Sequence, residues 1–158
     1  MSTYDELRVY YTRPPDERMA LLEQEMRGPL NETARLAAQL NSTNPFAAPA
    51  LFGGRFGELI EILQISSAKL AEVALQGPAL REKARAVGGL VEEDMHVFRH
   101  DLLTPLGTVR GVAEMLAKID VSETSGLPLG FTATAEALAA AVNELKDVLD
   151  ALTETRSR

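Results

Sequence analysis

The sequence predicts an all-α protein, a four-helix bundle made of two helical hairpins. Hydrophobic residues make up 46% of the chain, aromatic residues only 5%, and Trp is absent. Ala and Leu dominate the apolar set and recur at spacings of three and four, which is the period of an amphipathic helix. This pattern occurs twice along the chain, and two helical hairpins can bury their apolar stripes against each other.

The first predicted hairpin covers residues 1–76. A helix is expected to begin in the stretch Pro14, Pro15 and Asp16, because proline and acidic residues favour the first helical turn. Its apolar positions are Leu22, Met26, Leu30 (or Pro29), Thr33, Ala37 and Leu40. After the loop NSTNPFAAPALFGG a second helical pattern follows, and it is expected to end at Gly77-Pro78.

The second predicted hairpin covers residues 77–158. The apolar positions of its first helix are Phe98, Leu102, Leu106 (or Pro105), Val109, Ala113 and Leu116. After the loop DVSETSGLPLG, those of its second helix are Ala135, Leu138, Val142, Leu145, Leu149 and Leu152. The pair Gly88-Gly89 precedes these helices and has two interpretations, a helix break or a close-packing position.

The two hairpins are interpreted as copies of one unit. At an offset of 76 residues, Pro29 matches Pro105 and Leu30 matches Leu106. The other matches at this offset include Met19 with Met95, Met26 with Leu102, Ala37 with Ala113 and Leu40 with Leu116. In the second helices the offset is 75, with Phe56 matching Phe131, Leu63 matching Leu138, Leu70 matching Leu145 and Val73 matching Val148.

Charge and composition exclude several classes of function. The formal net charge of −7 disfavours nucleic acid and anionic membranes as partners, because their phosphates repel an acidic surface. The absence of Cys excludes disulfides and thiolate zinc sites. No apolar run approaches the roughly 20 residues that a membrane-spanning helix needs, and no signal peptide is visible, so a cytoplasmic location is expected.

One stretch, FRHDLLTPLGTVRGVAEML (Phe98 to Leu116), combines chemistry with a helical pattern. Residues four apart share a helix face, so Thr104 lies one turn from His100, with Asp101 at the flank of that face. Pro105 has no N–H, so the helix is expected to bend there. A neutral imidazole can attack phosphorus through one nitrogen if an acceptor such as Asp101 holds the proton on the other. The Thr104 hydroxyl could position a water molecule for hydrolysis.

This stretch resembles the H-box of sensor histidine kinases, the motif of their dimerisation and phosphoacceptor domain. The five positions of the motif are filled by His100, Asp101, Thr104, Pro105 and Leu106. By this resemblance His100 is the phosphoacceptor, Asp101 the general base and Thr104 the residue used in phosphatase chemistry. The resemblance implies a helical hairpin that pairs into a four-helix bundle.

The resemblance covers residues 85–155, and the chain departs from the family in two ways. No Asn-rich helix or glycine-rich ATP lid follows the hairpin, so no kinase activity with ATP is expected. The first copy has Gln24 where the second has His100, and Gly28 where the second has Thr104. A glutamine amide is not a phosphoryl acceptor, so residues 1–76 look like a degenerate phosphoacceptor hairpin.

These features predict a pseudo-dimer, in which the first copy closes the bundle and the second copy carries the chemistry. A monomeric pseudo-dimer and a homodimer both remain open. The predicted function is that of a bacterial histidine phosphotransfer protein, which accepts phosphate on His100 and exchanges it with a receiver-domain aspartate. Mg²⁺ is expected on the receiver only, and no metal or cofactor in this chain.

Two other interpretations compete with phosphotransfer. The chain could be a non-catalytic mimic that binds a histidine kinase or a response regulator, or it could be a regulatory segment of a larger kinase. A metal site at Glu92, His96 and His100 has little support, because no further ligand is apparent. Candidates for the docking surface of a partner are exposed apolar residues near His100, for example Leu103, Val109 or Val112.

Overall fold

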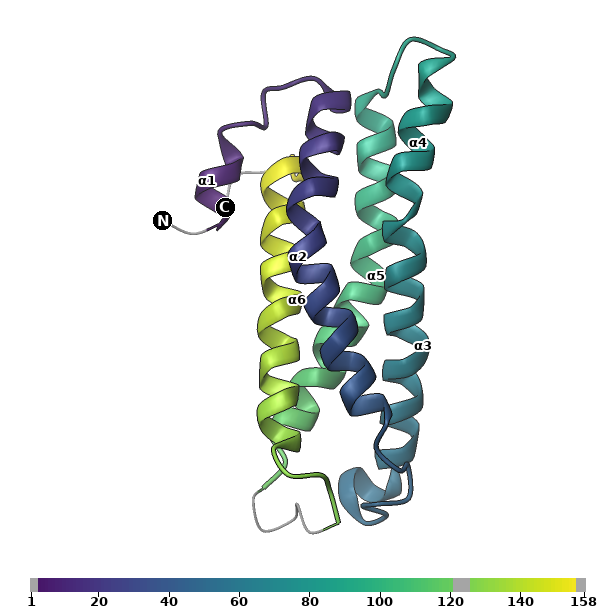
Figure 1. Ribbon diagram of the computed structural model, residues 1–158, viewed down its shortest axis with the longest axis vertical. Helices are drawn as coiled ribbons and strands as arrows, with labels where there is room; N and C mark the ends of the chain where they lie inside the picture. The colour runs from purple at the N-terminus through teal and green to yellow at the C-terminus, as the bar shows by residue number, and fades with distance from the viewer. Residues whose placement is uncertain (1–2, 121–125, 156–158) are drawn as a thin grey trace.

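The computed structural model describes residues 3–120 and 126–155, and the regular structure within these ranges is helical (Figure 1). The elements are α1 (Thr3–Arg8), α2 (Pro15–Asn41), the 3-10 helix η1 (Leu51–Gly54), α3 (Phe56–Ala74), α4 (Gln76–Arg85), α5 (Glu92–Ala117) and α6 (Phe131–Thr153). The prediction of an all-α protein is confirmed. None of the helices in the described ranges is both long and apolar enough to cross a bilayer.

The helix boundaries agree with the predicted ones in part. The first long helix, α2, begins at Pro15, within the predicted stretch of Pro14, Pro15 and Asp16. The predicted end at Gly77-Pro78 is wrong, because α3 ends at Ala74 and both residues lie in the first turn of α4. Proline is tolerated there because the first turn of a helix leaves its N–H groups without intrahelical partners. The short helix α1 was not predicted, and residues 121–125 of the second predicted loop lie outside the described residues.

Both interpretations of the Gly88-Gly89 pair apply. The two residues have φ angles of 96° and 109°, in the left-handed region that glycine adopts readily, and they separate α4 from α5. A Cβ atom on Gly89 would clash with the carboxylate of Asp16. That carboxylate accepts a 3.1 Å hydrogen bond from the backbone N–H of Leu90, so the break also joins the start of α5 to the start of α2.

The helices of the two predicted hairpins interleave. The helix α2 makes its most extensive contacts with α6, and α5 packs against both α6 and α3. Contacts between α2 and α3, which belong to the same predicted hairpin, are less extensive. In Figure 1 the long helices run side by side, and α2 crosses in front of α5. The first helix of each predicted hairpin is therefore packed against the second helix of the other.

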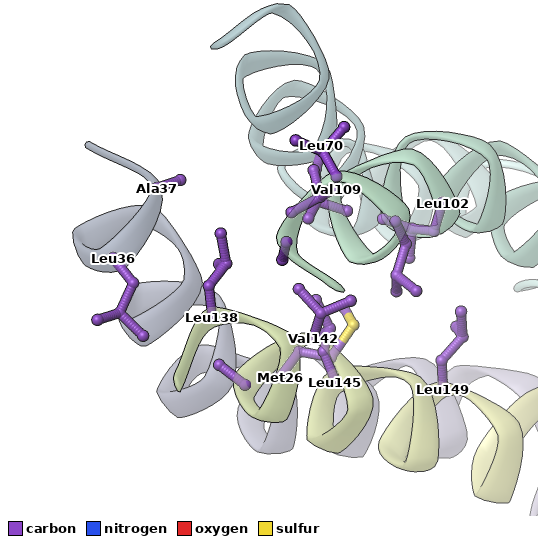
Figure 2. Packing of buried hydrophobic residues seen from close by; sticks show 14 of the residues in the cluster. Met26, Leu36, Ala37, Leu70, Leu102, Val109, Leu138, Val142, Leu145 and Leu149 are labelled. Carbon is purple, nitrogen blue, oxygen red and sulfur yellow. The ribbon is translucent and has the colours of Figure 1, made fainter. Parts of the chain in front are cut away.

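The buried core follows the repeat. Residues of α2 and their matches in α5 are buried in pairs, namely Met19 and Met95, Met26 and Leu102, Ala37 and Ala113, and Leu40 and Leu116. Figure 2 shows the side chains of Met26, Val109 and Val142, from three different helices, meeting in one interior. The matched aromatic residues Phe56 and Phe131, at the starts of α3 and α6, contact each other with ring centroids 5.9 Å apart.

Two arginine side chains cap the C-terminal end of α6. Arg8 of α1 donates hydrogen bonds to the carbonyl oxygens of Asp150, Ala151 and Glu154 at 3.3, 3.2 and 2.7 Å. Arg18 of α2, which is fully buried, donates to the carbonyl oxygen of Leu152 at 2.9 Å. The last carbonyl groups of a helix have no intrahelical partners and carry partial negative charge, so these cations stabilise the end of α6.

Candidate functional site

The helix α5 presents one polar edge to solvent. His100, Asp101 and Thr104 are exposed, whereas Pro105 and Leu106 are buried. This division follows from the amphipathic pattern, because the apolar stripe of α5 faces the core and turns the intervening polar positions outward. His100 and Thr104 lie one turn apart on the same edge, as their spacing predicts.

These residues line a groove of about 450 Å³ between α5 and α3. The lining residues from α5 are His100, Asp101, Thr104, Pro105 and Thr108. Those from α3 and the start of α4 are Ile65, Ser66, Lys69, Val73 and Gln76. Four of the five residues predicted for the site therefore share one groove, while Leu106 faces the core beneath it.

Lys69 is a cation of this groove that sequence reasoning missed. Its Nζ lies 3.7 Å from a carboxylate oxygen of Glu72, and both side chains are more than half exposed. An exposed ion pair of this kind is weak and exchanges readily with other ions. Lys69 is therefore available to an anion that enters the groove. The sequence pattern does not show that Lys69 and His100 line the same groove, because this depends on the packing of α3 against α5.

The predicted hydrogen bond between Asp101 and the imidazole of His100 is not formed. Within residues 3–120 and 126–155, neither side chain makes a hydrogen bond or an ion pair. Both are open to a partner, and catalytic hydrogen bonds often form only when the substrate is bound. Apart from the backbone hydrogen bonds of the helix, Thr104 takes part in one hydrogen bond within the same described residues. Its carbonyl oxygen accepts it from the hydroxyl of Thr108, at 3.2 Å.

The two prolines occupy equivalent places in the fold. Pro29 lies inside α2 and Pro105 inside α5, and both are buried. Each helix continues through its proline, and in Figure 1 both change direction near the middle. The proline of the first copy has this role without a histidine beside it, so the bend is a property of the architecture.

The equivalent positions of α2 and α6 have a different chemistry. Gln24 and Gly28 are exposed on α2 at the positions of His100 and Thr104. At the 75-residue offset, the residue of α6 that corresponds to Lys69 is the exposed Glu144. The α3–α5 groove thus has an imidazole and a cation, whereas the matched positions of α2 and α6 have an amide and a carboxylate.

The structure corrects the expected docking surface. Val109 and Val112 are buried in the core and Leu103 is half-buried, so the two valines cannot contact a partner. The exposed apolar residues beside His100 are Ile65 on α3, with 63% of its surface accessible, and Val97 on α5, with 48%. The expectation failed because the spacing of apolar residues along a helix does not show how much of the helix surface its neighbours cover.

One acidic residue that precedes His100 on α5, Glu92, has a structural partner on another helix. The carboxylate of Glu92 forms an ion pair with the buried guanidinium of Arg18, which joins α5 to α2. In the described part of the chain, no three His, Asp or Glu side chains are grouped so that they could hold a metal ion.

Comparison of the chain with protein-family models, with curated proteins and with solved structures finds no match.

Proposed function

We propose that the protein is a histidine phosphotransfer protein of a two-component pathway. In this proposal α2, α3, α5 and α6 form a pseudo-dimeric four-helix bundle with one working site. The observation that carries the proposal is the α3–α5 groove, in which an exposed His100 lies with Asp101, Thr104 and the cation Lys69. Each of these groups has a use in phosphoryl transfer, and the matched residues Gln24, Gly28 and Glu144 offer no imidazole, hydroxyl or cation.

The donor would be the aspartyl phosphate of a receiver domain. A ring nitrogen of neutral His100 attacks phosphorus, the P–N bond forms, and the P–O bond to the aspartate breaks with its electron pair leaving on the carboxylate. Asp101 accepts a hydrogen bond from the N–H of the other ring nitrogen and stabilises the positive charge that develops. Lys69 offsets the negative charge of the phosphoryl oxygens, since transfer of this kind depends on positioning and electrostatics. Mg²⁺ is supplied by the receiver.

The same site supports two further steps. In reverse transfer, the receiver's aspartate oxygen attacks phosphorus and the P–N electron pair returns to His100. In hydrolysis, a water molecule held by Thr104 attacks phosphorus instead, the P–N bond breaks with its electron pair returning to His100, the water gives a proton to the released imidazole, and inorganic phosphate leaves with the water oxygen. Whether Thr104 serves this second step is separable from transfer, because only hydrolysis requires its hydroxyl.

The arrangement of the helices supports the pseudo-dimer. Matched residues are buried in pairs, and the contact of Phe56 with Phe131 is a contact between equivalent positions of the two copies. The packing of α2 with α6 corresponds to that of α5 with α3. The first copy also contributes more than closure, because α3 supplies Lys69 to the working groove.

Transfer from a receiver tests the proposal. Receiver domains phosphorylated with radioactive phosphate are mixed with the protein, with the His100→Gln variant and with a His96→Gln control. His100 is exposed and glutamine stands at its equivalent position, so the variant is expected to fold normally. We expect label to move to the wild type and to the control, but not to His100→Gln.

The alternative is a non-catalytic protein that binds a kinase or a receiver. The observation in its favour is the exposed apolar pair Ile65 and Val97 beside the groove, which could hold a partner without any chemistry. It predicts that His100→Gln binds the partner with unchanged affinity, and that no label appears on the wild type even when a complex forms.

A further inference from the structure

A second groove, of about 540 Å³, opens between α2 and α3, with α4 at one end. Apolar side chains line most of it, among them Met26, Leu30, Leu70, Ala71 and Ala74. It shares no lining residue with the His100 groove. The helix α3 lies between the two grooves and contributes different residues to each. Lys69 and Val73 line the His100 groove, and Leu70 and Ala74 line this one.

This groove exists because the first copy has small residues where the second has large ones. At the 75-residue offset, Ala74 corresponds to Leu149, and Ser67 corresponds to Val142. Leu149 and Val142 are fully buried, and α6 packs closely on α5. On the first copy the contacts between α2 and α3 are less extensive, so the space that these side chains would fill is open.

One buried hydroxyl in this groove has no partner. Thr33 lines the groove, is 2% exposed, and its Oγ1 has no hydrogen-bond partner among the described residues. Leaving a buried hydroxyl unpaired costs free energy. The matching residue of the second copy, Val109, is apolar and has no such cost. A bound molecule with a hydrogen-bonding group would remove this cost.

The charged residues that line the groove, Glu23, Arg27 and Arg81, carry a net positive charge. Arg81 and Glu23 pair with each other, with Nε of Arg81 3.1 Å from Oε1 of Glu23. Arg27 also lines the groove, is exposed, and has no ion pair within the described residues. Because the charges of Arg81 and Glu23 neutralise each other, the guanidinium of Arg27 is the charge to which a ligand can bind.

We propose that the α2–α3 groove binds a small amphipathic acid, a molecule with a compact apolar body and one anionic group. The body would fill the space lined by Leu70 and Ala74, the anion would pair with Arg27, and a hydrogen-bonding group would reach Thr33. The groove falls in the range of about 300–1,000 Å³ typical of small-molecule sites. This site is independent of the phosphotransfer chemistry, so either proposal can fail without the other.

Two fluorescent probes test the site, the anionic 8-anilinonaphthalene-1-sulfonate and the neutral N-phenyl-1-naphthylamine. Both are titrated into the wild type and three variants. Ala74→Leu introduces the residue that fills the equivalent place in the second copy. Ala68→Leu is the matched control, because Ala68 is an exposed residue of the same helix and lines neither groove. Arg27→Gln removes the charge.

We expect both probes to bind the wild type saturably, at one site per chain. Ala74→Leu should weaken both by about tenfold or more, since it occupies the space of the apolar body, and Ala68→Leu should change neither. Arg27→Gln should weaken the sulfonate about three- to fivefold, as expected for an exposed charge pair, and leave the neutral probe within about twofold.

Three results would overturn the proposal. The first is the absence of saturable binding to a wild type whose circular dichroism shows full helicity. The second is equal binding by Ala74→Leu and Ala68→Leu, which would place the probe elsewhere. The third is a wild-type dimer in sedimentation that Ala74→Leu converts to a monomer, which would make the groove a self-association surface.

Discussion

At the scale of single residues, two exposed helix edges at matched positions carry different side chains. The exposed edge of α5 has His100 and Thr104, and the equivalent edge of α2 has Gln24 and Gly28. The sequence alone was enough to identify these positions, because both edges follow from helical spacing. It was not enough to identify Lys69, which reaches the groove from α3 through a tertiary contact.

Lys69 gives the first prediction. Replacing it with Glu, the residue at the equivalent position of α6, puts a carboxylate beside the incoming phosphate. We expect Lys69→Glu to slow phosphorylation of His100 by at least about tenfold, because a favourable charge interaction becomes a repulsive one. The measurement is the initial rate of transfer from a phosphorylated receiver. Lys118→Glu, on an exposed residue after α5, is the control for net charge, and equal rates for both variants would contradict the role of Lys69.

Asp150 is a second residue whose environment the spacing of the sequence does not reveal. Its side chain is 2% exposed and lies 2.7 Å from both the Arg99 guanidinium and the Lys146 ammonium. Burial raises the pKa of this carboxyl, but the hydrogen bonds and charges of Lys146 and Arg99 outweigh burial, so its pKa is lowered below 3.8. Because the folded pKa is below the unfolded one, this stabilisation is complete above the unfolded pKa and is lost as pH falls through the folded pKa.

A pH-dependent loss of stability is therefore expected below about pH 4, where the unfolded chain takes up this proton first. Asp150→Asn should lower the free energy of unfolding at pH 7 by about 3 kcal/mol, because two cations lose their buried partner. The variant should also lose less stability than the wild type between pH 5 and pH 3, in the acid range set by the carboxyl pKa. Urea unfolding at several pH values measures both effects. Parallel pH profiles for the two proteins would show that Asp150 does not titrate as described.

At the scale of helices, spacing predicted the long elements well and their partners poorly. The periodic seams of α2, α5 and α6 lie where the core is, because burial on one face requires that pattern. The helix α1 was missed because six residues are too few to show a period. The helix α2 packs more extensively on α6 than on α3. This was not predicted, because helices that follow each other in the chain are the simpler expectation as partners.

This pairing gives a prediction about the two halves. Residues 1–76 and 77–158 are produced as separate chains. Neither is expected to reach native stability as a monomer, because each half buries its core against the other, for example through Phe56 and Phe131. Mixing them should restore the helicity and the unfolding midpoint towards those of the intact chain, as followed by circular dichroism and sedimentation. A monomeric 77–158 fragment as stable as the whole protein would show that the halves are independent domains.

At the scale of the whole molecule, the helices of the two predicted hairpins line two different grooves. One inter-copy groove has the imidazole, a hydroxyl and a cation, while the space inside the first hairpin forms an apolar groove that the second hairpin fills with Leu149 and Val142. The spacing of the core positions was visible in the sequence, because burial on one face of a helix requires it. The grooves were not, because they depend on which helices approach each other and how closely.

The most direct test of the central claim is phosphorylation by phosphoramidate, read by intact mass, which requires no knowledge of the partner. We expect one acid-labile phosphoryl group per chain, present on the wild type and on His96→Gln and absent from His100→Gln. A folded wild type that takes up no phosphate, or a phosphate that persists in His100→Gln, would contradict it.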